Sequence, residues 1–443
     1  MKTHQLFRFV GLTMVVLSIA VCAEAQQPVV AAYDRERGQG MLQMVRDDLK
    51  GKYYDPSLRG MDLDARFKAA KEKIKTATSN GQIMGIIAQM MLDLGDSHTF
   101  FLPPGRASRT EYGWKVQMFG DRPFVIAVKP KSDAETKGLK VGDEVLAIDG
   151  NAVTRDNLWT MQYYYYSLRP KPGMKVTVKH PDGKQEELAI LAKVTEGRTV
   201  TLVQTGWNGT SYDSDAIRER ENEEHLMRQR FASSGSDVFI WKMPLFDLTN
   251  DGVDEMMDKA RKYKALVIDL RGNAGGAVTT LNRLIGNLFD HDVKVADWKG
   301  RKKFDPQIAK SRGKTFDGKL AVLIDNGSAS ASEIFARVIQ LENRGIVLGD
   351  RSSGSVMVSQ VYDHEVGLDQ VAFFAASVTE ADLIMKDGKS LENVGVTPDK
   401  LMLPSAQALA LGSDPVLAIA VEFLGGKLSA AEAGKLFPIE WPK

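Results

Sequence analysis

The chain has 443 residues, of which 43% are hydrophobic and 26% are charged, and its formal net charge is +1. This composition is ordinary for a globular protein and excludes a largely disordered chain. The length exceeds what one hydrophobic core usually serves, so we expect two or three domains. The balanced charge gives no indication of a nucleic-acid or anionic-membrane partner.

The first 25 residues have the pattern of a secretory signal peptide. Positive charges precede an apolar run over residues 9–21, and "AEA" at 23–25 resembles a cleavage site. A membrane anchor is the alternative, but the run is shorter than the roughly 20 residues that span a bilayer. We therefore expect export across the inner membrane to a periplasmic or extracellular location. Cys22, the only cysteine, lies in this segment, so the mature chain would have no disulfide.

Four further segments differ in pattern. Residues 26–108 carry apolar residues at three- and four-residue spacing, which predicts a layer of helices. Residues 109–195 show short strands and turns around one helix, "RDNLWTMQYYYYSL". Residues 196–236 are rich in charge and predict a linker with a solvated helix. In residues 237–443, the apolar runs "DVFIWKM", "KALVIDL", "KLAVLID", "RGIVLG" and "QVAFFAASV" alternate with helices, which predicts βαβ units and a buried parallel sheet.

The stretch "DLRGNAGG" ends one of these strands in a turn. Gly275 and Gly276 lack side chains, so their backbone N–H groups can approach a substrate oxygen closely. The alternative is an ordinary tight turn between a strand and a helix. Asp269 and Arg271 are expected to fix the end of the strand by hydrogen bonds rather than to contact substrate.

The stretch "SASE" places Ser330 where a helix is expected to begin. Ser330 with Glu333 three residues later is the pattern of a capping box. A helix N-terminus also stabilises an oxyanion, so the N–H of Ala331 can serve an acyl-transfer intermediate on Ser330.

The stretch "LGDSHT" presents Asp96, Ser97 and His98 where a helix is expected to end. Asp96 is expected to brace this turn. None of the six histidines shows a metal-ligand spacing such as HExxH, and no metal or other cofactor is expected.

Together, these stretches resemble the serine peptidase family of C-terminal processing (tail-specific) proteases and the tricorn core protease. The resemblance extends to a PDZ-like module around "GLKVGDEVLAIDGNAV" and to the closing "LENVGVTPD". It implies an α/β fold with a crotonase-like (ClpP/crotonase-type) catalytic domain over 237–443, a PDZ-like domain over 109–195 and an N-terminal helical region, 26–108, that carries a catalytic histidine. By motif, Ser330 matches the nucleophile, and the N–H groups of Gly276 and Ala331 match the oxyanion hole.

The general base departs from the commoner form of this family. Relatives of the Ser/Lys type have a lysine at the position of Ser355, and a serine cannot act as that base. The tricorn-like branch uses a histidine preceded by a serine, with a distant glutamate. The resemblance therefore implies His98 as the general base, oriented by Ser97 and Glu392.

The PDZ-like module implies recognition of peptides or unfolded proteins, by addition of a strand to a sheet edge and capture of a C-terminal carboxylate. Gly113 and Trp114 match the carboxylate loop, although "EYGWKV" departs from the usual apolar, glycine-rich sequence. The tyrosines at 163–166 are expected to pack on the module's helix, and one ring can line the peptide groove. The implied function is a secreted serine endopeptidase. The alternative is a non-catalytic peptide-binding protein on the same scaffold, because the family lysine is missing.

Overall fold

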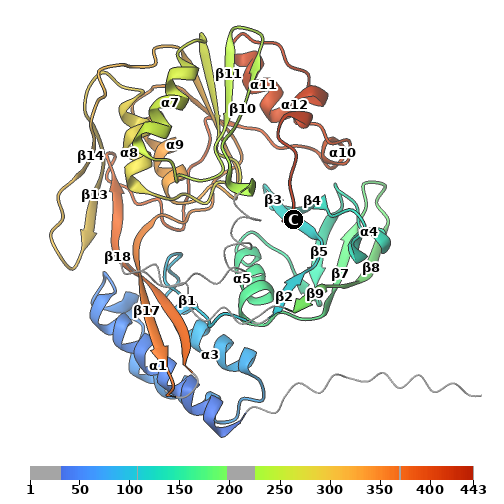
Figure 1. The fold of residues 1–443 in the computed structure, drawn as a ribbon, viewed down its shortest axis with the longest axis vertical. Helices are drawn as coiled ribbons and strands as arrows, with labels where there is room; N and C mark the ends of the chain where they lie inside the picture. Colours follow the sequence, from blue (N-terminus) through green and yellow to red (C-terminus); the bar gives the residue numbers. More distant parts are fainter. Residues whose placement is uncertain (1–30, 107, 197–224, 369–370, 443) are drawn as a thin grey trace, which may run out of the picture.

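The computed structural model describes residues 31–106, 108–196, 225–368 and 371–442. The predicted signal peptide and most of the predicted linker therefore lie outside the described residues. In the described part of the chain, no helix is both long and apolar enough to cross a membrane. Figure 1 shows three bodies: N-terminal helices, a β-rich domain, and a larger α/β domain formed by the C-terminal half of the chain.

The N-terminal helices are α1 (Ala32–Lys52), α2 (Leu63–Lys75) and α3 (Asn80–Leu92). The side chains of Asp62 and Ser79 cap the N-termini of α2 and α3. The helices bury a shared apolar core, in which Phe374 and Val378 of strand β18 (Ala372–Met385) also take part. Strand β1 (Phe100–Leu102) follows the helices and pairs with β18, so this layer is joined to the C-terminal half of the chain.

The β-rich domain is built on an antiparallel sheet in the order β3-β4-β5-β7-β8. Its strands are β3 (Trp114–Phe119), β4 (Arg122–Val128), β5 (Glu144–Ile148), β7 (Gly173–Lys179) and β8 (Gln185–Leu191), with β6 (Asn151–Ala152) paired to β5. Helix α4 (Asp133–Thr136) and helix α5 (Leu158–Tyr163), which continues as a π-helical turn over Tyr164–Leu168, cover the sheet. Strands β2 (Ser108–Glu111) and β9 (Lys193–Glu196) pair at the base of the domain. Strand β3 lies at the sheet edge.

The α/β domain contains a six-stranded sheet in the order β10-β11-β12-β15-β16-β19. Its strands are β10 (Arg230–Ser234), β11 (Val238–Lys242), β12 (Ala265–Asp269), β15 (Lys319–Ile324), β16 (Ile346–Gly349) and β19 (Lys400–Leu401), all parallel except β10. Helices α7 (Asn250–Ala260), α8 (Val278–Gly286) and α9 (Ala331–Leu341) pack on one face. Helices α11 (Pro415–Phe423) and α12 (Ala430–Leu436) pack on the other, and the short α10 (Ala406–Ala410) precedes them.

Successive side chains of the central strands point to opposite faces of this sheet. Leu266 and Ile268 of β12 face the core with α7 to α9, whereas Ala265 and Val267 face the core with α11. Because both faces are covered, the strand sequence is apolar throughout, as is typical of a buried parallel sheet. The predicted parallel core is present in β11, β12, β15 and β16.

Two predicted elements lie elsewhere. Strand β10 falls inside the segment predicted as a linker. Among the described residues of that segment, His225–Met227 form a short helical turn. "QVAFFAASV" does not join the parallel sheet: β18 belongs to a second sheet with β1, β13 (Val293–Gly300), β14 (Gln307–Ala309) and β17 (Met357–Val366). The first half of β18 packs on the N-terminal helices, and its second half, with Leu383 and Met385, packs in the α/β core. An apolar run in the sequence does not distinguish burial in a parallel sheet from burial in a second, antiparallel sheet.

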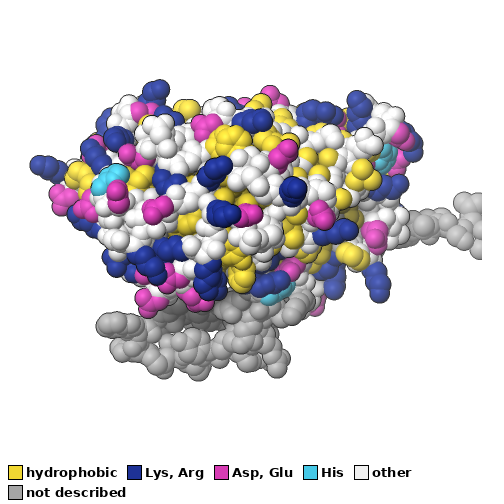
Figure 2. Space-filling model, turned by 90° about the horizontal axis from the view of Figure 1, so that it is seen from above, with side chains coloured by type: hydrophobic (Ala, Val, Ile, Leu, Met, Phe, Trp, Pro, Cys, Tyr) yellow, Lys and Arg dark blue, Asp and Glu magenta, His cyan; other side chains and the backbone are white. Residues whose placement is uncertain are grey.

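Acidic and basic side chains are interspersed on the face shown in Figure 2, with hydrophobic side chains between them. This agrees with a net charge near zero.

Candidate active site

Ser330 is the N-cap residue of α9 and has an unusual backbone conformation. Its φ of 53° and ψ of −117° lie in a region that residues other than glycine rarely occupy. Such a conformation costs of order 1–3 kcal/mol and persists only when neighbouring groups hold it. The N–H of Ser330 donates to the carbonyl of Ser355 (2.8 Å) and to Glu333 Oε2 (3.1 Å), and Ser330 forms the predicted capping box with Glu333.

The turn after β12 approaches Ser330 at a distance that only glycine permits. A Cβ atom on Gly275 would lie 2.7 Å from Ser330 Cβ and 3.0 Å from the backbone nitrogen of Ala331. Gly275 and Gly276 also have positive φ values, of 100° and 134°. Among the described residues, no acceptor takes a hydrogen bond from the N–H of Gly276 or of Ala331. Two free donors therefore lie on segments that touch beside Ser330.

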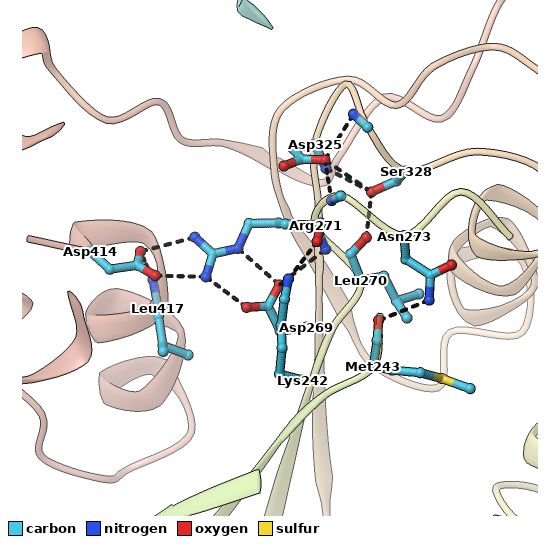
Figure 3. Close-up of polar contacts among 12 residues, drawn as sticks. Lys242, Met243, Asp269, Leu270, Arg271, Asn273, Asp325, Ser328, Asp414 and Leu417 are labelled. Carbon is cyan, nitrogen blue, oxygen red and sulfur yellow. Dashed lines mark hydrogen bonds and ion pairs between the residues drawn. The ribbon is translucent and has the colours of Figure 1, made fainter. Parts of the chain in front are cut away.

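A buried ion network holds this turn from below (Figure 3). Arg271 pairs with Asp269 (2.7 Å) and with Asp414 (2.6 Å), and Lys242 lies 3.2 Å from Asp269. Burial alone would raise the pKa of Asp269, but Arg271 and Lys242 outweigh it and hold that pKa well below its usual range. Asp269 is therefore ionised, and it fixes the end of β12, as expected.

Ser97, His98 and Glu392 form one hydrogen-bonded chain. Glu392 Oε1 accepts from the N–H of Ser97 and Oε2 accepts from Ser97 Oγ, each at 2.8 Å, and Ser97 Oγ lies 2.8 Å from His98 Nδ1. The hydroxyl has a single proton. When Ser97 donates it to ionised Glu392, Oγ accepts from Nδ1–H, and in this tautomer His98 has its lone pair on Nε2.

The turn that carries His98 is anchored to β18. Asp96 accepts from the N–H of His98 (2.9 Å), from Tyr53 (3.0 Å) and from Thr379 (2.6 Å), and Ser377 Oγ donates to the carbonyl of His98 (2.6 Å). Asp96 thus braces the turn, as expected. Burial lowers the pKa of His98 below its usual value, and the charge of Asp96 offsets only part of this effect. The ring is therefore neutral near neutral pH.

Residues 352–356 connect the two halves of the site. Glu333, which is fully buried, accepts hydrogen bonds from Ser352 Oγ (2.6 Å) and from the N–H groups of Gly354 (2.7 Å) and Ser355 (2.9 Å). The next N–H, of Val356, donates to Glu392 Oε2 (3.0 Å). Burial raises the pKa of Glu333 to about 7 although its donors favour the ionised form, and burial also raises the pKa of Glu392.

The structure thus brings Ser97, His98 and Glu392 together, and it brings Ser330 together with Gly275, Gly276 and Ala331. In the described part of the chain, no hydrogen bond joins His98 to Ser330. Such contacts are often long in the absence of substrate. Ser355, where the resemblance places the lysine of other relatives, accepts the N–H of Ser330 at its carbonyl oxygen (2.8 Å), and its hydroxyl bonds to that of Ser353 (2.8 Å).

Gly113 and Trp114 line a cavity of about 450 Å³ in the β-rich domain. The cavity lies between β3 and the α5 segment, where Tyr165 and Tyr166 contribute two of the predicted tyrosines. Gly113 has a positive φ of 74°, and a Cβ there would lie 2.5 Å from Ser132 Cβ. Neither Ser330 nor His98 lines this cavity, so a peptide bound there would occupy a site separate from Ser330.

Sequence reasoning missed the residues that support the site from a distance. Asp414, Ser377 and Thr379 lie far along the chain from their partners, and nothing in their local sequence marks them. Within the described residues, no group of three or more His, Cys, Asp or Glu side chains is arranged to hold a metal ion.

The close contact at Gly275 predicts a specific loss of stability. Gly275→Ala should lower the free energy of unfolding by roughly 1–3 kcal/mol more than Gly272→Ala, because only the former pushes a methyl group against Ser330. Gly272 is the matched control, since its φ is also positive (71°) but no atom lies within 4 Å of the position that a Cβ would take there. Urea unfolding of both variants measures the difference, and equal losses would contradict the contact.

Comparisons with known proteins agree with the fold. Residues 237–402 match peptidase family S41, and residues 111–191 match the PDZ domain. The tail-specific protease of Haemophilus influenzae is 28% identical over 362 residues, 76% of this chain and 48% of that protein. The chloroplastic C-terminal processing peptidase of Tetradesmus obliquus is 25% identical over 372 residues, 80% of this chain and 74% of that protein. The chain thus spans about half the length of the first relative.

Among solved structures, mature CPAF superposes with a TM-score of 0.64 and 16% identity, over 86% of this chain and 95% of that one. At this identity the likeness concerns the fold alone, and it agrees with the predicted α/β class. The resemblance expected from the sequence motifs is confirmed: the chain carries a domain of peptidase family S41 and a PDZ domain, and it is a relative of the tail-specific and C-terminal processing proteases.

Proposed function

We propose that the protein is a serine endopeptidase that hydrolyses peptide bonds in peptides or unfolded proteins through an acyl-enzyme on Ser330. The observation that carries the proposal is the hydrogen-bonded chain from Glu392 through Ser97 to His98, which leaves the lone pair of His98 on Nε2. A neutral imidazole with that tautomer is the form that accepts a proton from a serine.

In the proposed reaction, Ser330 Oγ attacks the scissile carbonyl carbon while His98 Nε2 takes its proton. The N–H groups of Gly276 and Ala331 hold the oxyanion, and the N-terminus of α9 adds its favourable dipole. His98 then gives the proton to the leaving amine. Water repeats the sequence on the acyl-enzyme and releases the second product. Ser97 and Glu392 orient the imidazole and stabilise its cationic form.

The PDZ domain supports recognition of extended peptides in this proposal. Strand β3 is at a sheet edge and can pair with a peptide strand, while the loop with Gly113 and Trp114 receives a C-terminal carboxylate. Export to a periplasmic or extracellular location remains a prediction from the first 25 residues.

A non-catalytic peptide-binding protein is the second candidate. Two observations favour it: Ser355 replaces the lysine of the Ser/Lys relatives, and no hydrogen bond joins His98 to Ser330 within the described residues. Chemical reactivity of Ser330 separates the two candidates.

The reactivity of Ser330 is the first test. A fluorophosphonate probe should label the wild-type chain, and Ser330→Ala should lose both labelling and peptidase activity. The thermal midpoint of that variant should shift by only a few degrees, because loss of an N-cap costs about 1 kcal/mol. Ser328→Ala tests specificity, since Ser328 lies nearby in the same turn but is fully buried. A folded Ser330→Ala protein with full activity would end the serine-peptidase proposal.

The second test is the pH dependence of kcat/KM. His98 must be neutral to act as a base, and its pKa is lowered by burial. Activity should therefore be present at neutral pH and fall through an acid limb that lies below about 6.5, the usual value for histidine. Glu392, whose pKa is raised, is hydrogen-bonded to the same chain, so its titration is coupled to that of His98. The midpoint of the acid limb therefore reports the hydrogen-bonded chain as a whole. A limb well above the histidine value would contradict this assignment of the base.

The third test compares three variants on one unstructured peptide. His98→Ala should lose several orders of magnitude in kcat/KM, as removal of a triad base does. Glu392→Gln should lose less, roughly 100-fold, because it weakens the orientation of His98 and the stabilisation of its cationic form but leaves the base itself in place. Ser355→Ala is the matched control and should stay within about threefold. If Ser355→Ala were as inactive as Ser330→Ala, the base would be wrongly assigned.

A further inference from the structure

The last described residues of the chain lie against the peptide groove of the PDZ domain. We define the C-terminal tail as residues 437–442, which follow α12 without forming a helix or strand. Trp441 and Pro442 line the same cavity as Gly113 and Trp114. Figure 1 shows this end of the chain running from the α/β domain to β3 and β4. The tail therefore lies where an incoming peptide would bind.

The contacts of the tail involve β3 directly. Lys115 of β3 places its Nζ 5.1 Å from the centre of the Trp441 ring and 3.4 Å from the carbonyl oxygen of Glu440. Lys129, at the end of β4, approaches the same ring at 5.9 Å. Two cations thus face an indole ring, and a main-chain carbonyl of the tail accepts a hydrogen bond from a lysine side chain of β3.

A second set of contacts ties the tail to the segment that follows the linker. Arg228 makes a two-pronged ion pair with Glu440 at 2.6 and 2.7 Å, and Arg230 donates to the carbonyl of Pro438 (2.8 Å). His225 Nε2 lies 3.2 Å from the carbonyl oxygen of Trp441. These contacts are mostly exposed, and exposed ion pairs and cation–π contacts are individually weak. The tail is held in place but can be displaced.

The tail leaves part of the groove unused. A cavity of about 450 Å³ stays open beside the tail, lined by Trp114 on one side and Trp441 on the other. A peptide that fills this space buries apolar surface that the tail leaves uncovered. Such a peptide can therefore compete with the tail although the tail is covalently attached.

We propose that the C-terminal tail is a built-in competitor for the peptide groove, with Trp441 as its anchor, and that peptide ligands bind by displacing it. The proposal rests on the proposed peptide-binding role of the PDZ domain. The apparent affinity for a peptide is then the intrinsic affinity reduced by the fraction of molecules in which the groove is open. The groove selects peptides with a bulky aromatic or apolar residue at the place of Trp441, since Tyr112, Met161 and Tyr166 line it.

The test uses the full chain and a fluorescein-labelled peptide of the tail sequence, Phe-Pro-Ile-Glu-Trp-Pro, with binding followed by fluorescence anisotropy. Trp441→Ala should bind this peptide about tenfold or more tightly than the wild type, since one molecule in ten with an open groove gives that ratio. Arg228→Ala, which releases Glu440 without altering the cavity lining, should change affinity in the same direction. The same peptide with alanine in place of its tryptophan should not bind to Trp441→Ala.

Phe423→Ala is the matched control, because it removes an exposed aromatic ring from α11 that does not line the cavity. Its affinity should equal that of the wild type, and all variants should unfold at the same temperature. Weaker binding to Trp441→Ala would show that Trp441 contacts the bound peptide rather than competing with it, and it would overturn the proposal. Equal binding to wild type and Trp441→Ala, or binding to neither, would overturn it as well. Labelling of Ser330 by fluorophosphonate is read separately, so failure here is distinct from failure of the peptidase proposal.

Discussion

The arrangement of the site depends on two buried carboxylates that share one short segment of chain. Glu333 and Glu392 accept four hydrogen bonds from residues 352–356, three at Glu333 and one at Glu392. Glu333 also holds the N–H of Ser330, whereas Glu392 holds Ser97 and, through it, His98. The proposed nucleophile and the proposed base are therefore positioned by the same strip of backbone. Loss of either carboxylate would leave buried N–H groups without an acceptor, which is costly in a region without access to water.

The ion network beside the turn after β12 also fixes the position of a segment of the site. Arg271 links Asp269, at the end of β12, to Asp414, at the start of α11, and thereby joins the sheet to the helices on its second face. Buried charges are stable only when each has its partners, so this network tolerates one geometry. That geometry places Gly275 against Ser330, where a side chain would not fit.

The proposed base, His98, follows the N-terminal helices, so the proposed site depends on the assembly of the whole chain. His98 reaches the α/β domain because β1 pairs with β18, and β18 belongs to both hydrophobic cores. The PDZ domain is joined to the same region through Gln117, which donates to Asp325 (2.6 Å), and through Arg155, which pairs with Asp350 (2.6 Å). Asp325 in turn accepts from the N–H of Gly272 (2.8 Å) in the turn after β12. Strand β3 and the turn that approaches Ser330 are thus connected by two hydrogen bonds through Asp325.

The sequence by itself determined the parallel strands, the motif at Ser330 and the unusual pairing of serine and histidine at 97 and 98, because these depend on local pattern: apolar runs, glycines in a turn, a capping residue. Only the tertiary structure decided that β18 lies outside the parallel sheet, that Arg271 pairs with Asp414, and that Trp441 lines the cavity of the PDZ domain. Each of these joins residues far apart in the chain. Local sequence sets the preferences of a segment, but the partner that a side chain meets is set by how distant segments pack against one another.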